Sequence, residues 1–149
     1  MKICATTLGE TAGDLMSMTM HIGYAISSII LLSIFFILFI TQLFTNKYHP
    51  TLYWAVILAT STAGTTMSDF MNRTLNLGYA TGSIILLALL IATLIVWMYT
   101  ERSLSVTAIR TRRAELFYWT AILFSNTLGT ALGDFLADDS GLGFSGGAL

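Results

Sequence analysis

The sequence predicts an all-α fold, a polytopic transmembrane helical bundle in which a two-helix unit is repeated. Three observations lead to this prediction. Of the 149 residues, 55% are hydrophobic and only 10% are charged, whereas about a quarter of the residues of a soluble domain are charged. Two long stretches carry no charge, and the same residue types recur three times in fixed register. Lipid rather than water is therefore the expected solvent of this chain.

Five segments are expected to cross the bilayer. The two strongly apolar segments are 22–44 and 77–99, which contain no charged residue and are long enough to span roughly 30 Å of hydrocarbon. The other three are apolar but mixed with Thr, Ser, Gly and one or two acids, and they cover 2–18, 52–71 and 116–137. The predicted order is therefore mixed, apolar, mixed, apolar, mixed.

Aromatic residues and a proline mark the starts of two mixed helices. Tyr53 and Trp54 open the second, Tyr118 and Trp119 open the third, and such side chains favour the interface between membrane and water. Pro50 stands just before the second helix, where its missing N–H group is harmless.

The basic residues predict the orientation. The connections 45–51 and 100–115 hold five of them, whereas the opposite connections hold only Arg73. The five are Lys47, Arg102, Arg110, Arg112 and Arg113. Because cytoplasmic loops are enriched in Lys and Arg, both connections are expected in the cytoplasm. Orientation also explains the cluster of arginines, so no nucleic-acid partner is expected.

An internal repeat organises the whole chain. Thr7, Gly9, Asp14 and Gly23 recur as Thr62, Gly64, Asp69 and Gly78, and again as Thr127, Gly129, Asp134 and Gly143. The repeat units cover approximately 1–46, 50–100 and 115–149 of a single membrane domain, 1–149. Each unit holds an even number of spans, so all units point the same way across the membrane. The third unit stops as its second helix begins, which predicts five spans, the start of a sixth, and a fragment of a longer protein.

These residues resemble a known family. The strings 2–14, 53–54, 117–119 and 125–134 are similar to a bacterial family of uncharacterised multi-pass membrane proteins built from tandem repeats of unknown function, usually four. The resemblance covers essentially the whole chain. It implies two spans per repeat, a fourth unit, and a place in the bacterial inner (cytoplasmic) membrane. It implies no established activity.

Polar residues four apart form a row along each mixed helix. Because residues at this spacing share a helix face, each row is a polar ladder that ends in an aspartate. A charge at the middle of a lipid-facing span costs about 2.5–3.5 kcal/mol, so the rows are expected to face inward. Oxygen ligands suit hard cations and protons. The candidate cation pathway is Glu10, Asp14, Asp69, Asp134, Thr6, Ser61, Thr65, Asn126 and Thr130.

Glu10 breaks the repeat. Its equivalents are Thr65 and Thr130, and it lies deeper in its helix than the aspartates. An acid that the repeat does not supply is the leading candidate for a coupling or binding residue. The alternative is that Glu10 and Asp14 are neutralised and hold helices together.

Small residues at helical spacing are expected to let helices approach closely, because spans associate by packing rather than by a hydrophobic drive. This packing role is predicted for Gly9, Gly13, Gly64, Gly129, Gly133, Gly78 and Gly82.

Two functions remain open at this point. The first is a transporter or channel for a small cation, either a metal or a proton. The second is a membrane scaffold whose polar rows only pack helices or bind a partner span. No enzyme activity and no cofactor are expected, since His21 and His49 are isolated and Cys4 is the single cysteine. The expected partners are the lipid bilayer, a small cation and a second copy of the chain.

Overall fold

The computed structural model describes residues 2–20, 23–45, 49–102 and 111–139, and every regular element within them is helical. The helices are α1 (Lys2–Asp14), α2 (Tyr24–Phe44), α3 (Pro50–Asp69), α4 (Tyr79–Glu101) and α5 (Arg112–Asp134). The predicted all-α class is therefore confirmed. The expected start of a sixth span falls on 140–149, which lies outside the described residues.

Each mixed helix ends in a π-helical turn of five residues directly after its aspartate. These turns are Leu15–Thr19, Phe70–Thr74 and Phe135–Asp139. In the first two, the N–H of Met20 donates to the carbonyl of Leu15 and that of Leu75 to Phe70. The predicted mixed helices are thus right in position, but their last turns are wider than a regular α-helix.

The starts of the later helices follow local chemistry. Pro50 is the first residue of α3, so this helix begins two residues earlier than predicted. The helix α5 begins four residues earlier than predicted, because the Thr111 hydroxyl accepts a hydrogen bond of 3.0 Å from the N–H of Ala114 and caps its first turn. The connection between α4 and α5 is therefore shorter than 100–115.

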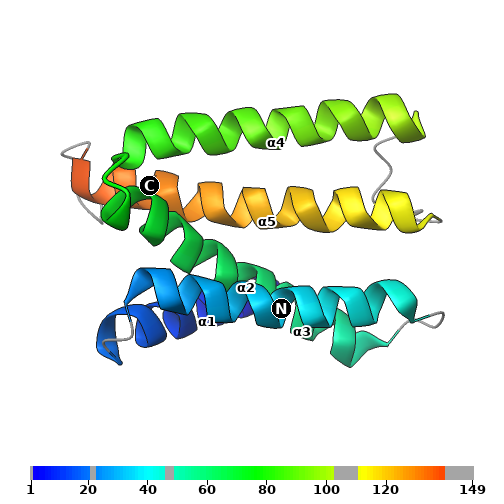
Figure 1. The fold of residues 1–149 in the computed structure, drawn as a ribbon, viewed down its shortest axis with the longest axis horizontal. Helices are drawn as coiled ribbons and strands as arrows, with labels where there is room; N and C mark the ends of the chain where they lie inside the picture. The colour runs from blue at the N-terminus through cyan, green and yellow to red at the C-terminus, as the bar shows by residue number, and fades with distance from the viewer. Residues whose placement is uncertain (1, 21–22, 46–48, 103–110, 140–149) are drawn as a thin grey trace.

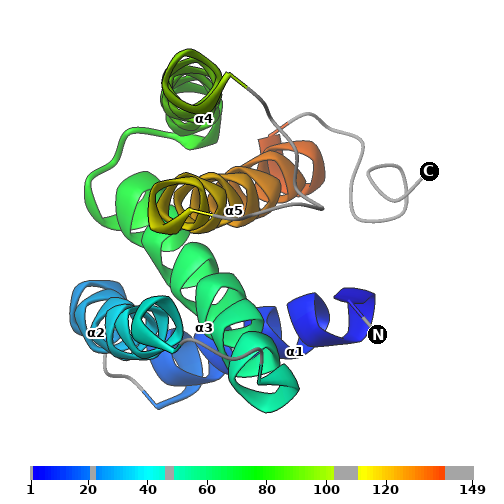
Figure 2. The same ribbon diagram turned by 90° about the vertical axis from the view of Figure 1, so that its right-hand side faces the viewer.

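The helix α3 occupies the middle of the molecule (Figures 1 and 2). It packs against α1, α2 and α5, while α4 packs against α5. The mixed helices α3 and α5 end on the same side of the molecule, and α2 and α4 run in the opposite direction (Figure 1). Each apolar helix thus packs on the mixed helix of the next repeat. One link is the Ser28 hydroxyl, which donates to the Thr66 carbonyl at 2.8 Å.

The main hydrophobic core lies between α2, α3 and α5, towards the starts of α3 and α5. It includes Phe35, Ile57 and Trp119, of which Trp119 is only 2% exposed. The ring of Trp119 lies 5.7 Å from that of Tyr53, and the Tyr53 and Tyr118 hydroxyls lie 3.3 Å apart. Equivalent aromatic residues of the second and third repeats therefore pack against each other.

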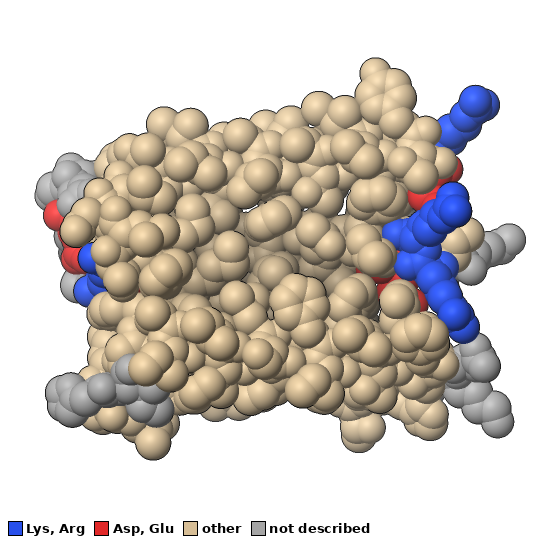
Figure 3. All heavy atoms as spheres, viewed as in Figure 1, with Lys and Arg blue, Asp and Glu red and all other residues tan. Residues whose placement is uncertain are grey.

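The outer faces of α2 and α4 are apolar. Among the described residues, these two helices have the length and composition needed to cross a membrane, with mean hydropathies of 2.5 and 2.4. Ile29 on α2 and Ile84 on α4 are 67% and 68% exposed. Figure 3 shows the charged side chains at the two ends of the visible face, with a broad uncharged band between them. Most of the basic ones gather where α4 ends and α5 begins.

Candidate functional site

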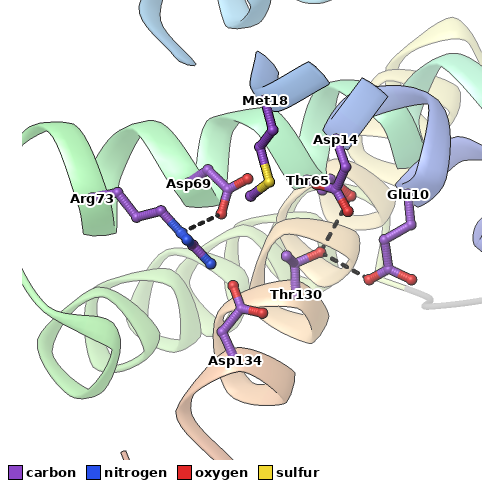
Figure 4. A pocket seen from close by; sticks show the side chains of 8 residues that line it. All are labelled: Glu10, Asp14, Met18, Thr65, Asp69, Arg73, Thr130 and Asp134. Carbon is purple, nitrogen blue, oxygen red and sulfur yellow. Dashed lines mark hydrogen bonds and ion pairs between the residues drawn. The ribbon is translucent and has the colours of Figure 1, made fainter. Parts of the chain in front are cut away.

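The polar rows of α1, α3 and α5 border one cleft. Two adjoining cavities form it, and they share Glu10 and Thr130. The first cavity, of about 170 Å³, lies where the three helices end (Figure 4) and is lined by Glu10, Asp14, Met18, Thr65, Asp69, Arg73, Thr130 and Asp134. The second, of about 230 Å³, is lined by Thr6, Glu10, Ser61, Ser125, Asn126, Gly129 and Thr130. All nine residues of the predicted pathway therefore line this cleft.

The three repeated aspartates converge on the first cavity because each is the last residue of its α-helix. Asp69, on the central helix, is the most enclosed and is only 2% exposed. One of its carboxylate oxygens lies 3.3 Å from Nε of Arg73. The other, Oδ2, is buried and has no hydrogen-bond partner among the residues that the structure describes. Asp14 and Asp134 are half-buried on either side. An ionised oxygen without a partner is costly to bury, so this position favours the arrival of a proton or a cation.

Arg73 is the functional residue that the sequence analysis used only for orientation. It lies in the π turn after α3, and its guanidinium carbon is 6.0 Å from the Tyr24 ring and 5.7 Å from the Tyr79 ring. These tyrosines occupy equivalent positions in the first and second repeats. Burial acts to lower the pKa of Arg73, but Asp69 and the two tyrosines outweigh it and the pKa is raised. Arg73 therefore remains a cation held beside the aspartates.

The signal for Arg73 is present in the sequence. It follows Asp69 by four residues, a spacing that brings two side chains onto one helix face. Its equivalents are Met18 and Asp138, so it breaks the repeat just as Glu10 does.

Thr130 joins the two cavities. Its hydroxyl oxygen lies 3.4 Å from the Thr65 hydroxyl, 3.5 Å from Oε1 of Glu10 and 3.4 Å from the Asn126 carbonyl. A hydroxyl carries a single hydrogen, so it donates to only one of these acceptors at a time. All three distances are long for hydrogen bonds of this kind. The contact between α5 and Glu10 is therefore loose and able to switch.

Glu10 differs from the sequence prediction in one respect. It was expected to face inward, and it lines both cavities, but its side chain is also exposed. The cause is that the cleft is open between α1 and α5, beside Glu10 and Gly129. Ser61 closes the opposite wall by donating a 3.0 Å hydrogen bond to the Thr6 carbonyl.

All four acids line the first cavity, and Glu10 also lines the second. Among the residues that the structure describes, no three His, Cys, Asp or Glu side chains are placed to hold a metal ion. The described arrangement therefore suits a cation that contacts one or two carboxylates at a time.

The predicted packing glycines fall into three groups. A Cβ atom on Gly9 would lie 2.6 Å from Cβ of Ser61, one on Gly64 would lie 3.1 Å from the Thr127 nitrogen, and Gly13 and Gly82 are similarly confined. These four allow close helix approach. Gly78 instead adopts φ +75° just before α4, so its role is to turn the chain. Gly129 and Gly133 meet no described atom within 4 Å, because no described helix covers that side of α5.

Comparison with known families identifies three repeats. A family model described as Repeat of Unknown Function (DUF347) matches residues 1–48, 52–103 and 117–149. Comparison with curated proteins and with solved structures finds no match. The matched segments cover nearly the whole chain, so the chain belongs to this repeat family. The resemblance to a repeat family of unknown function is thereby confirmed.

Proposed function

We propose that this member of the DUF347 repeat family is a multi-pass membrane protein that moves a small cation, a proton in the first instance, along the cleft between α1, α3 and α5. The observation that carries the proposal is the convergence of Glu10 and the three repeated aspartates on one cleft bordered by hydroxyl groups.

The apolar exterior supports the membrane part of the proposal. Two helices have the hydropathy of spans, and their outward isoleucines would be exposed to water in a soluble protein. The basic residues gather at one end of the molecule (Figure 3), as expected if the connections 45–51 and 100–115 lie in the cytoplasm of a bacterium. The bilayer is then the inner membrane, and α1, α3 and α5 cross it with their polar faces turned towards one another.

The distribution of acids supports the cation part. Within a membrane, ionisable side chains are costly and mark ion pathways or proton relays. Asp69 offers a buried oxygen that has no hydrogen-bond partner among the described residues, and Glu10 lines both cavities, with its Oε1 3.5 Å from the Thr130 hydroxyl. A proton passed between these carboxylates needs no metal cage, and no three His, Cys, Asp or Glu side chains of the described residues are placed to form one.

Arg73 has a specific role in this proposal. It is a tethered cation that occupies the Asp69 carboxylate when no transported cation is bound. A proton on Asp69 would weaken this ion pair and release the guanidinium, which the rings of Tyr24 and Tyr79 remain able to hold. The charge state of Asp69 therefore determines whether Arg73 is paired with Asp69 or held only by the tyrosine rings of the first and second repeats.

The test is proton flux into liposomes that contain the purified protein. A potassium diffusion potential drives the flux, and a pH-sensitive dye inside the vesicles reports it. We expect wild-type flux above that of empty liposomes and a loss of at least about tenfold in Glu10→Gln and Asp69→Asn, about 1.4 kcal/mol on the barrier. Glu115→Gln, which removes an acid from the opposite end of α5, is the matched control and should retain the flux. Equal flux in all four proteins, or no flux above empty liposomes with protons or metal cations, would overturn the proposal.

A scaffold is the second candidate, and the close helix contacts favour it. Gly9, Gly13 and Gly64 bring backbones together, and Ser61 links two helices by a hydrogen bond. A scaffold predicts that Asp69→Asn lowers the melting temperature in detergent. A transporter predicts loss of flux with the melting temperature nearly unchanged.

A further inference from the structure

The outer face of α4 carries a continuous row of apolar side chains. Leu87, Ile91 and Ile95 follow one another four residues apart, and Met98 continues the row, so all four share one helix face. Each of them is exposed. Leu86, on the other face of α4, is fully buried and packs in the core with residues of α5. We call the four exposed residues the apolar stripe, and it is turned away from α5.

A third cavity lies where the apolar stripe reaches the end of α4. It has a volume of about 540 Å³ and is lined by Ile95, Met98, Tyr99 and Arg102. None of these residues lines the cleft between α1, α3 and α5, so the two sites are separate. Tyrosine and arginine side chains combine an apolar body with a polar tip, which suits the boundary between hydrocarbon and water. The cavity therefore joins an apolar wall to a cationic end.

Arg102 is available to a ligand. Among the described residues, it takes part in no ion pair. The neighbouring acid, Glu101, accepts a 3.1 Å hydrogen bond from the Thr111 hydroxyl and is thereby engaged with the start of α5. Arg112 and Arg113 stand in the first turn of α5, at the end of the molecule where the basic side chains gather (Figure 3). A ligand at this cavity therefore meets an excess of positive charge.

The first repeat indicates that neighbouring repeats leave this face uncovered. Ile95 of α4 is equivalent to Ile40 of α2. The second repeat and part of the third follow α2, yet Ile40 is 51% exposed, as against 49% for Ile95. Ile29 and Ile84, the pair at the other end of these helices, are equally matched. Each apolar helix uses its opposite face to contact the next repeat, so a repeat that follows α4 is expected to leave the apolar stripe free.

We propose that this cavity binds one anionic phospholipid, with an acyl chain along the apolar stripe and the phosphate at Arg102. From Leu87 to Met98 the stripe extends about 16 Å at about 1.5 Å per residue. This is close to the depth of one leaflet, which is half of a hydrocarbon core of roughly 30 Å. A guanidinium group forms strong, charge-assisted hydrogen bonds with phosphate oxygens. The inference rests on the membrane part of the proposed function and not on cation movement.

Charge selects the headgroup. In the proposed orientation, the cavity opens to the cytoplasmic leaflet, where anionic lipids are attracted by basic residues next to a span. Phosphatidylglycerol carries a net negative charge. The choline group of phosphatidylcholine would instead bring a cation close to Arg102 and to the arginines at the start of α5. An anionic lipid is therefore the occupant that the surrounding charge favours.

Native mass spectrometry of the purified protein tests the inference. The protein is released from detergent after incubation with equal amounts of phosphatidylglycerol and phosphatidylcholine that have the same acyl chains. We expect the wild type to retain phosphatidylglycerol in preference, and Arg102→Gln to lower this retention about fivefold, the effect of one basic residue at an anionic surface. Arg113→Gln is the matched control, because it removes the same charge at the same end without lining the cavity. Equal retention of the two lipids by the wild type, or equal losses in the two variants, overturns the inference.

A second variant blocks the cavity and keeps Arg102. Met98→Glu places a carboxylate four residues before Arg102, where it can pair with the guanidinium and repel a phosphate. Thr100→Glu is its control, since Thr100 is equally exposed and changes the net charge by the same amount but does not line the cavity. Both positions are exposed, so the melting temperature should stay unchanged in both variants. Phosphatidylglycerol retention should fall in Met98→Glu only, and wild-type retention in Met98→Glu overturns the inference.

Flux in liposomes of phosphatidylcholine alone separates this inference from the proposed function. These liposomes hold no anionic lipid, so their proton flux tests cation movement by itself. Flux without preferential retention of phosphatidylglycerol overturns the lipid site and leaves the transport proposal intact. Preferential retention that depends on Arg102, in a protein without flux, supports the lipid site and overturns transport.

Discussion

The two ends of α3 and α5 differ in how closely their side chains pack and in the charge that they carry. At the start of the helices, Tyr53 and Trp119 pack ring against ring, and the hydroxyls of Tyr53 and Tyr118 are 3.3 Å apart. At the other end, Asp69 and Asp134 line a cavity, and one buried oxygen of Asp69 has no hydrogen-bond partner in the described part of the chain. Equivalent residues of neighbouring repeats therefore meet at both ends, but only the aromatic end is closely packed.

Under the proposed transport function, this difference assigns stability to the aromatic end and cation movement to the carboxylate end. Aromatic side chains that bury large areas stabilise the helix contacts. Buried carboxylates around a cavity cost stability and are found where ions or protons act. We therefore expect substitutions at the aromatic end to change folding and substitutions at the carboxylate end to change flux. Three predictions test this separation, from the largest expected effect on stability to the smallest.

Trp119→Ala should have the largest effect. Trp119 is 2% exposed and lies in the core between α2, α3 and α5, so its removal leaves a large cavity. We expect a loss of about 3–5 kcal/mol in the free energy of unfolding. Chemical unfolding in detergent, followed by circular dichroism, measures it. A loss below about 1 kcal/mol would show that the aromatic end does not hold the helices together.

Gly64→Ala should have an intermediate effect. The added Cβ atom would lie 3.1 Å from the Thr127 backbone, so α3 and α5 must separate at a cost of about 1–3 kcal/mol. Gly129→Ala is the matched control on the next repeat, since no described atom lies within 4 Å. There the change should stabilise the helix by up to about 1 kcal/mol. Melting curves of the two variants should therefore shift in opposite directions, and shifts in the same direction would contradict the packing role of Gly64.

Asp69→Asn should have the smallest effect on stability. It removes the ion pair with Arg73, whose side chain is 37% exposed, but it keeps the shape of the residue. We expect the free energy of unfolding to change by less than about 1 kcal/mol, while proton flux is lost. A large fall in stability, of about 3–5 kcal/mol, is instead the result expected for a structural buried pair. That result would show that the aspartates, like the aromatic residues, serve to hold the helices together.

The sequence predicted most of the elements and the residues of the cleft, for a simple physical reason. Spacing by four residues assigns Thr6, Glu10 and Asp14 to one face of α1, and the repeat carries that face to α3 and α5. The spacing of residues along one helix gives no information about the angle at which two helices cross. It therefore did not predict that Glu10 lies on the open side of the cleft. The position of Arg73 between the rings of Tyr24 and Tyr79 was missed for the same reason.

The differences at the helix ends have a related cause. Spacing by about four residues does not distinguish an α-helical turn from a π-helical turn, so the sequence pattern does not reveal where the α-helix widens. The glycine pattern of Gly129 and Gly133 equals that of the first repeat, but contact requires a neighbour, which a pattern does not show.

The π turns change where the side chains after each aspartate are placed. An i to i+5 turn holds one residue more than the α-helical turn that it replaces, and such turns are rare. Here one follows the repeated aspartate in each of the three units. The widened turn is therefore a property of the repeat unit rather than of one copy, and it rotates the chain by the same amount at each of the three aspartates.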